Sequence, residues 1–141
     1  MKTNKFLAIL LLLVTTLILT VGCEKSSSVD EENDVAQIMQ QKILGYWNLT
    51  EFIEETKTGN EPPVIINNDP QNVYFEFFAN GKGKTNAEGE EEFSYEVKAN
   101  NVLILWDNEQ KIIELTDHKL TFKNTATQGN TTYTQTYFLT R

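Results

Sequence analysis

From residue 45 onward, hydrophobic and polar positions alternate with a period of two in most segments of the chain. The clearest case is residues 93–98, in which an apolar residue with a large side chain is followed each time by a polar one. A period of two places the apolar residues on one face of a β-strand. The alternating segments are separated by short runs of Asn, Asp and Gly, which are typical of turns. The pattern predicts eight strands, over residues 46–53, 72–78, 82–86, 93–98, 102–106, 111–116, 119–123 and 131–140.

Short turns between consecutive strands predict antiparallel pairing, because parallel strands need long crossover connections. Eight strands joined in this way favour a closed up-and-down β-barrel, which leaves no unpaired edge. A two-sheet β-sandwich is the alternative all-β fold. The connection over residues 54–71 contains three prolines, and we interpret it as a large loop over one mouth of the barrel.

Residues 35–44 predict a short helix ahead of the strands. Their apolar residues recur at spacings of three and four, which gives the helix one apolar stripe. Such a stripe serves either to bind a partner or to dock on the helix's own domain, and we favour docking. The stripe consists of Val35, Ile38, Met39, Lys42 and Ile43.

The start of the chain resembles a bacterial lipoprotein signal. Lys2 and Lys5 precede an apolar run over residues 6–19, and small residues then lead to Cys23, the only cysteine. The run is shorter than the ~20 residues of a spanning helix, so we expect residues 1–22 to be a cleaved signal peptide. The resemblance to a lipobox implies that Cys23 becomes the lipidated first residue, with acyl chains such as palmitate anchoring it to the membrane. An ordinary secretory signal followed by a free cysteine is the alternative.

Residues 23–34 are rich in serine and acidic residues, and we interpret them as a flexible tether that leads to one domain over residues 35–141. An acidic cluster behind an acylated cysteine also resembles the surface-export signal of Bacteroidetes lipoproteins. Both interpretations place the domain in the cell envelope, anchored to the outer membrane and facing either the periplasm or the outside.

Short motifs after residue 38 resemble the lipocalin-like lipoproteins of Bacteroidetes. The first strand opens on a Gly-x-Trp signature, Gly45 and Trp47, and the chain finishes on Arg141. The hairpin at residues 74–83 and the strand pair at residues 113–121 follow the order of that family. In lipocalins an arginine of the last strand commonly lies across the tryptophan of the first. The resemblance therefore implies an eight-stranded barrel closed at one end by Gly45, Trp47 and Arg141.

Charge narrows the classes of partner. The chain has 12 basic and 20 acidic residues, and loss of Lys2 and Lys5 with the signal leaves a net charge of −10. This charge argues against nucleic-acid binding, which needs a basic face, and against electrostatic attachment to anionic lipids. The expected membrane contact is therefore the acylated cysteine alone.

Residues typical of catalysis or of metal binding are few. His118, the only histidine, lies in a predicted turn without a cysteine or serine motif around it, so a catalytic triad or a zinc site lacks parts. The acidic run at residues 90–92 is interpreted as a solvated hairpin, because it lacks the spacing of a calcium loop. We expect no cofactor, no metal and no enzymatic activity.

The barrel interior is the remaining candidate site. Two classes of function stay open: a module that binds a small apolar or amphipathic ligand, and a structural or interaction lipoprotein with a filled barrel that contacts another envelope protein. The residues that alternation turns inward, and that would face a ligand, are Phe75, Phe77, Phe93, Tyr95, Leu103, Leu105, Phe122 and Tyr137.

Overall fold

A computed structural model describes residues 27–141. The predicted signal peptide, Cys23 and the first residues of the predicted tether lie outside the described residues. The described part begins with a helix, α2 (Ser27–Ile43), and continues as strands. The strands are β1 (Gly45–Thr58), β2 (Val64–Asn68), β3 (Tyr74–Phe77), β4 (Lys82–Thr85), β5 (Glu91–Lys98), β6 (Val102–Leu105), β7 (Asn108–Leu115), β8 (Lys119–Gln128) and β9 (Thr131–Thr140).

Eight of these strands close into an antiparallel barrel. The sheet order runs from β1 through β3 and the following strands to β9, and β9 pairs again with β1. Closure satisfies the backbone edges that an open sheet would expose. The prediction of an eight-stranded up-and-down barrel is thereby confirmed, in place of the β-sandwich.

The segment over residues 54–71 differs from its prediction as a loop. Its first residues continue β1 to Thr58, and Val64–Asn68 form β2, which pairs with β1 between Phe52 and Thr56. The prolines lie before and after β2 and not within it, so they leave its hydrogen bonds intact. The segment is therefore a hairpin arm and not a cover over the barrel mouth.

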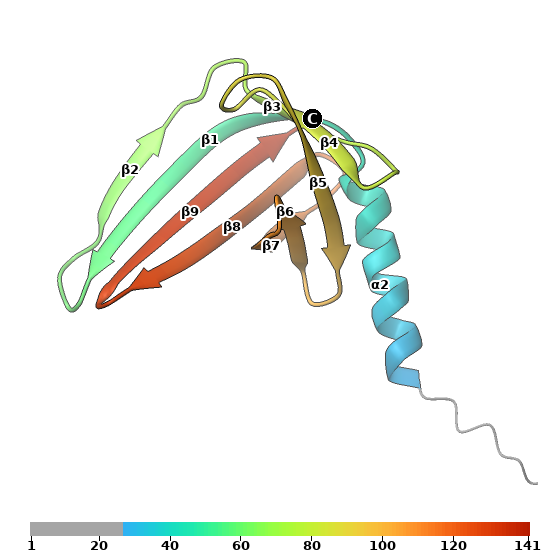
Figure 1. The fold of residues 1–141 in the computed structure, drawn as a ribbon, viewed down its shortest axis with the longest axis horizontal. Helices are drawn as coiled ribbons and strands as arrows, with labels where there is room; N and C mark the ends of the chain where they lie inside the picture. The colour runs from blue at the N-terminus through green and yellow to red at the C-terminus, as the bar shows by residue number, and fades with distance from the viewer. Residues whose placement is uncertain (1–26) are drawn as a thin grey trace, which may run out of the picture.

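The long strands extend beyond the barrel as a sheet that we call the wing, formed by β2 with the distal parts of β1, β8 and β9. Figure 1 shows these strands side by side, reaching away from β3–β7 and α2. A bulge between Leu49 and Glu51 separates the barrel part of β1 from its wing part. Threonine pairs link neighbouring wing strands, among them Thr58 with Thr131 at 3.0 Å. The apolar residues of β2, Val64, Ile65 and Ile66, are each more than half exposed.

Helix α2 begins at Ser27, eight residues before the predicted start, so residues 27–34 are helical where a flexible tether was expected. The acidic residues that made this stretch look like a tether fall in the N-terminal half of the helix. Within residues 27–141, no helix is long and apolar enough to span a membrane.

The apolar stripe of α2 docks only in part. Met39 and Ile43 are buried in the barrel core, whereas Val35 and Ile38 are about half exposed. Gln40 donates a hydrogen bond to the hydroxyl of Tyr95 on β5 at 3.0 Å, and that hydroxyl donates to the carbonyl of Phe78 at 2.7 Å. The last two turns of α2 are thus fixed to the barrel.

Trp47 and Arg141 lie at the end of the barrel next to α2. The indole of Trp47 is fully buried and donates from Nε1 to the carbonyl oxygen of Ile43 at 2.8 Å. The guanidinium carbon of Arg141 lies 4.1 Å from the centre of the indole ring, within cation–π range. The guanidinium also donates to the backbone carbonyls of Lys42, Leu44 and Asp117. Three chain segments are therefore joined beside one buried tryptophan.

Gly45 enters this cluster with a backbone φ of +103°, a conformation that other residues rarely adopt. A Cβ at this position would lie 3.4 Å from Nη1 of Arg141. That distance is an ordinary van der Waals contact, so the positive φ, and not crowding against Arg141, is what favours glycine here.

Candidate functional site

A pocket of about 410 Å³ opens among the loop before β5, the β6–β7 hairpin and the inner faces of β8 and β9. On β8 and β9 its lining residues Phe122 and Tyr137 lie one inward position further from Arg141 than the buried pair Leu120 and Leu139. The pocket thus occupies the barrel interior on the side away from the closed end. It is lined by Phe75, Ala87, Glu88, Glu91, Leu105, Trp106, Asn108, Gln110, Phe122, Asn124 and Tyr137.

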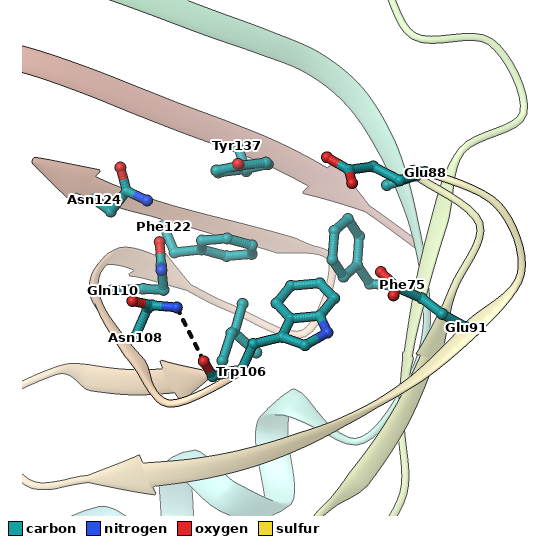
Figure 2. A pocket seen from close by; sticks show the side chains of 11 residues that line it. Phe75, Glu88, Glu91, Trp106, Asn108, Gln110, Phe122, Asn124 and Tyr137 are labelled. Atoms are coloured by element: carbon teal, nitrogen blue, oxygen red, sulfur yellow. Dashed lines mark hydrogen bonds between the residues drawn. The ribbon is translucent and has the colours of Figure 1, made fainter.

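Four aromatic rings form the centre of the pocket, as Figure 2 shows. Phe75, from β3, is almost fully buried and meets the other three at right angles or nearly so. Its ring centre lies 6.1 Å from Phe122, 6.4 Å from Tyr137 and 6.5 Å from Trp106. Phe122 and Tyr137 stack on each other with centres 4.8 Å apart. Tyr137 also packs on Phe52, with ring centres 4.8 Å apart, and Trp106 packs on Phe93 at 4.9 Å, so neighbouring rings hold all four in place.

Trp106 is held in an unusual conformation. The sequence predicts that it ends a strand over residues 102–106, but β6 ends at Leu105, and Trp106 and Asp107 form the hairpin turn with φ values of +47° and +64°. Type I′ hairpins require positive φ at both central residues and normally use Asn or Gly for them. A bulky residue in this region is strained, and such strain gathers at functional sites.

Gln110 is the one buried polar side chain of the pocket. It is only 6% exposed, and its Oε1 has no hydrogen-bond partner among the described residues. An unpaired buried amide oxygen costs about 1 to 3 kcal/mol of stability. Figure 2 shows it between Asn108 and Asn124, on the same side of the aromatic rings. The pocket therefore contains an acceptor that a bound molecule could satisfy.

Carboxylates line the opposite side. Figure 2 places Glu88 and Glu91 across the aromatic rings from the three carboxamides. Burial raises the pKa of the Tyr137 hydroxyl, and the negative charges of Glu54 and Glu88 raise this pKa further. Tyr137 therefore lies in a region of negative potential.

The structure separates the eight residues that were predicted to face a ligand into two groups. Phe75, Leu105, Phe122 and Tyr137 line the pocket. The other four belong to the filled part of the core and do not line it; they are Phe77, Phe93, Tyr95 and Leu103. The residues of the 54–71 arm do not line this pocket either, so they do not form its mouth.

Several lining residues are absent from the sequence-based prediction. Gln110 was missed because the strand was expected to begin at Lys111, whereas β7 begins at Asn108. Stepping back in twos from the buried Ile112 places Gln110 and Asn108 on the inner face, and that signal was present in the sequence. Glu88 comes from a loop, where alternation gives no information. Glu91 opens β5 two residues before the buried Phe93, so stepping back in twos would have placed it on the inner face as well.

The described residues offer no constellation of side chains for metal binding. Within residues 27–141, no group of three or more His, Cys, Asp or Glu side chains is close enough together to hold a metal ion. His118 is exposed in the turn before β8, and its backbone amide donates to Oγ1 of Thr116 at 3.3 Å. Its position in the structure is that of a turn residue.

The fold and the pocket define a small antiparallel β-barrel with a cavity at one end. The sequence profile of the lipocalin-like domain family matches residues 43–122, more than half of the chain. The protein therefore belongs to the lipocalin-like domain family. No curated protein and no solved structure gives a significant match to the chain.

Proposed function

We propose that this protein is a lipid-anchored, extracytoplasmic lipocalin-like module that binds one small amphipathic molecule and carries out no catalysis. The molecule occupies the pocket bounded by Phe75, Trp106, Phe122 and Tyr137. Lipocalin-like barrels are suited to this role, because a small eight-stranded barrel has room for one small ligand at most.

The observation that supports binding most strongly is the unpaired Oε1 of Gln110. A barrel that served only as a scaffold would gain stability from an apolar residue at this position. The neighbouring strain at Trp106 points the same way, since an Asn or Gly at this turn would be less costly. The unpaired oxygen of Gln110 and the strained backbone of Trp106 each lower the stability of the fold. A ligand that contacts both residues would explain why both occur in one pocket.

Replacing Gln110 with leucine tests this proposal. The Gln110→Leu protein is expected to be more stable by about 1 to 3 kcal/mol, because it no longer buries an unpaired acceptor. The same protein is expected to carry less of the small molecule that we expect native mass spectrometry to find on the chain isolated from its envelope. Denaturant unfolding measures the first effect and the bound mass measures the second.

Gln135→Leu provides the matched control. Gln135 lies in the wing and its amide donates to Oε1 of Glu54 at 3.5 Å, so this substitution removes a paired group. We expect no gain in stability and no loss of the bound mass. Destabilisation by Gln110→Leu, with the bound mass retained, would contradict a ligand role for Gln110.

The second part of the proposal is the anchor. The apolar run before Cys23 and the small residues next to it support lipidation of this cysteine and location in the outer membrane of a Bacteroidetes-type envelope. The net charge of −8 for the whole chain supports an attachment that is hydrophobic and not electrostatic.

Cys23→Ser should move the protein from the membrane fraction to the soluble fraction of the cell envelope. Serine at this position cannot carry the thioether-linked lipid, and the acyl chains supply most of the membrane affinity. Fractionation followed by immunoblotting measures the shift. Glu24→Ser, one residue further along, is expected to leave the protein in the membrane fraction, and membrane retention of Cys23→Ser would refute the anchor.

A second function has its own supporting observation. Phe77, Phe93, Tyr95 and Leu103 fill their part of the barrel, and the three apolar residues of β2 are exposed on the wing. These features support an interaction lipoprotein that contacts another envelope protein. Absence of any copurified small molecule, together with a protein retained on the wing, would favour this function.

A further inference from the structure

The charged residues that line the pocket are all acidic, and their charge restricts the ligand more than the volume of the pocket does. Glu88 and Glu91 line it, and no Lys, Arg or His among the described residues does so. A carboxylate ligand such as a fatty acid would therefore meet like charge without a cationic partner. A ligand with a positive charge would meet two carboxylates.

The aromatic rings favour the same sign of charge. A cation is attracted to the face of an aromatic ring, and tryptophan gives the strongest attraction. Trp106 lines the pocket and is 41% exposed, and Figure 2 shows Phe122 between it and Tyr137. Tyr137 is also in the negative field of Glu54 and Glu88. Rings and carboxylates together create a local environment for an organic cation.

The unpaired oxygen of Gln110 adds a requirement at the other side of the pocket. Oε1 is a hydrogen-bond acceptor, so its partner on the ligand is an N–H or O–H group. The glutamates and the carboxamides lie on opposite sides of the rings in Figure 2. The ligand thus needs a cation at one end, a flat apolar body and a donor at the other end.

We propose that the pocket selects a protonated amine carried on a flat aromatic body, with the ammonium group toward Glu88 and Glu91 and a ring donor on Gln110. This inference rests on the proposed function, because it assigns the chemistry of the ligand to the same pocket. It excludes the anionic amphiphiles that the apolar interior alone would admit.

A matched series of indoles tests the sign of the charge. Tryptamine, tryptophol and indole-3-acetate share one ring system and differ only in an ammonium, a hydroxyl or a carboxylate. Isothermal titration calorimetry with the chain from residue 24 onward, which retains every buried core residue, gives their affinities. We expect tryptamine to bind about tenfold more tightly than tryptophol, with indole-3-acetate weakest, and the difference to shrink as salt is added.

Two further measurements assign this preference to named groups. The Glu88→Gln/Glu91→Gln protein is expected to bind tryptamine and tryptophol within about twofold of each other, since the ammonium loses its carboxylates. Methylation of the indole nitrogen removes the donor, so 1-methyltryptamine should bind several-fold more weakly than tryptamine. Gln110→Leu should abolish that difference.

The outcomes test the preference for a cation separately from the proposed ligand-binding function. Equal or tighter binding of indole-3-acetate would overturn the cation preference and leave a ligand-binding barrel. An unchanged tryptamine preference in the Glu88→Gln/Glu91→Gln protein would remove the carboxylates from the site. Failure of all three indoles to bind at millimolar concentration would count against the pocket as a ligand site altogether.

Discussion

Replacing Trp47 with alanine is expected to cost about 3 to 5 kcal/mol of unfolding free energy, the range for deletion of a buried aromatic side chain. Trp47 has no solvent exposure, and the deletion also removes its bond to the Ile43 carbonyl and the surface on which Arg141 stacks. Small domains have only about 5 to 15 kcal/mol of stability in total. Denaturant unfolding of the chain from residue 24 onward is the measurement.

Trp106→Ala is the matched control, since it makes the same change at a tryptophan that is 41% exposed in a strained turn. We expect a loss smaller by about 1 to 2 kcal/mol there, because a large part of the Trp106 side chain is already in water. Alanine keeps a Cβ, so the strain of the positive φ is the same in both proteins and does not enter the comparison. Equal losses for the two variants would contradict the role of Trp47 in closing the barrel. Unchanged stability of Trp47→Ala with loss of ligand would make Trp47 a binding residue instead.

Gly83→Val is expected to destabilise the barrel by about 3 kcal/mol, near the upper end for overpacked cores. Gly83 lies on β4 opposite Phe93, and a Cβ there would lie 2.4 Å from Cζ of the Phe93 ring and 2.6 Å from the carbonyl oxygen of Glu76. The ring could turn aside, but the carbonyl belongs to the paired strand β3. Because a backbone atom must move, the cost is not avoided by side-chain rotation.

Lys84→Val on the same strand is the control, because it introduces the same residue type at a position without steric crowding. It therefore measures the effect of the strand propensity of valine alone. Lys84 points to solvent, and its ion pair with Glu92 at 3.5 Å joins two exposed side chains, so its loss should change stability by less than about 1 kcal/mol. Thermal unfolding of both variants compares the two positions. If Gly83→Val were as stable as Lys84→Val, the barrel would have room for a valine side chain beside Phe93. That result would contradict the close packing described for Gly83.

The barrel could be predicted from the sequence because its core residues obey strict alternation. Phe93, Tyr95 and Val97 on β5 are all buried, and the residues between them are exposed. Strand β2 was not predicted because prolines on either side of a short apolar stretch are typical of a loop. Propensity describes each segment by itself, whereas β2 is a strand because β1 extends far enough to pair with it.

The candidate site was predicted only where it coincides with the core. Phe75 and Phe122 follow the alternation, but Trp106 leaves it through a turn that its residue type does not favour. Gln110 occupies an apolar position in the pattern, and a polar residue there weakens the period-two signal that would identify it. Functional residues depart from the local rules of folding, so a method based on those rules tends to miss them.

The pairing of β1 with β9 also determines when the barrel can be completed. β1 is the first strand and β9 the last, so closure waits until residues 131–140 have been synthesised. Pairing across such a separation is slow, because the chain entropy of a long loop must be lost first. The β1–β2 hairpin is local and can form early, which covers part of one edge of β1 during the wait. Because β2 and β9 pair with opposite edges of β1, the arm protects only one of these edges from aggregation, and the edge that takes β9 stays open until the last strand is made.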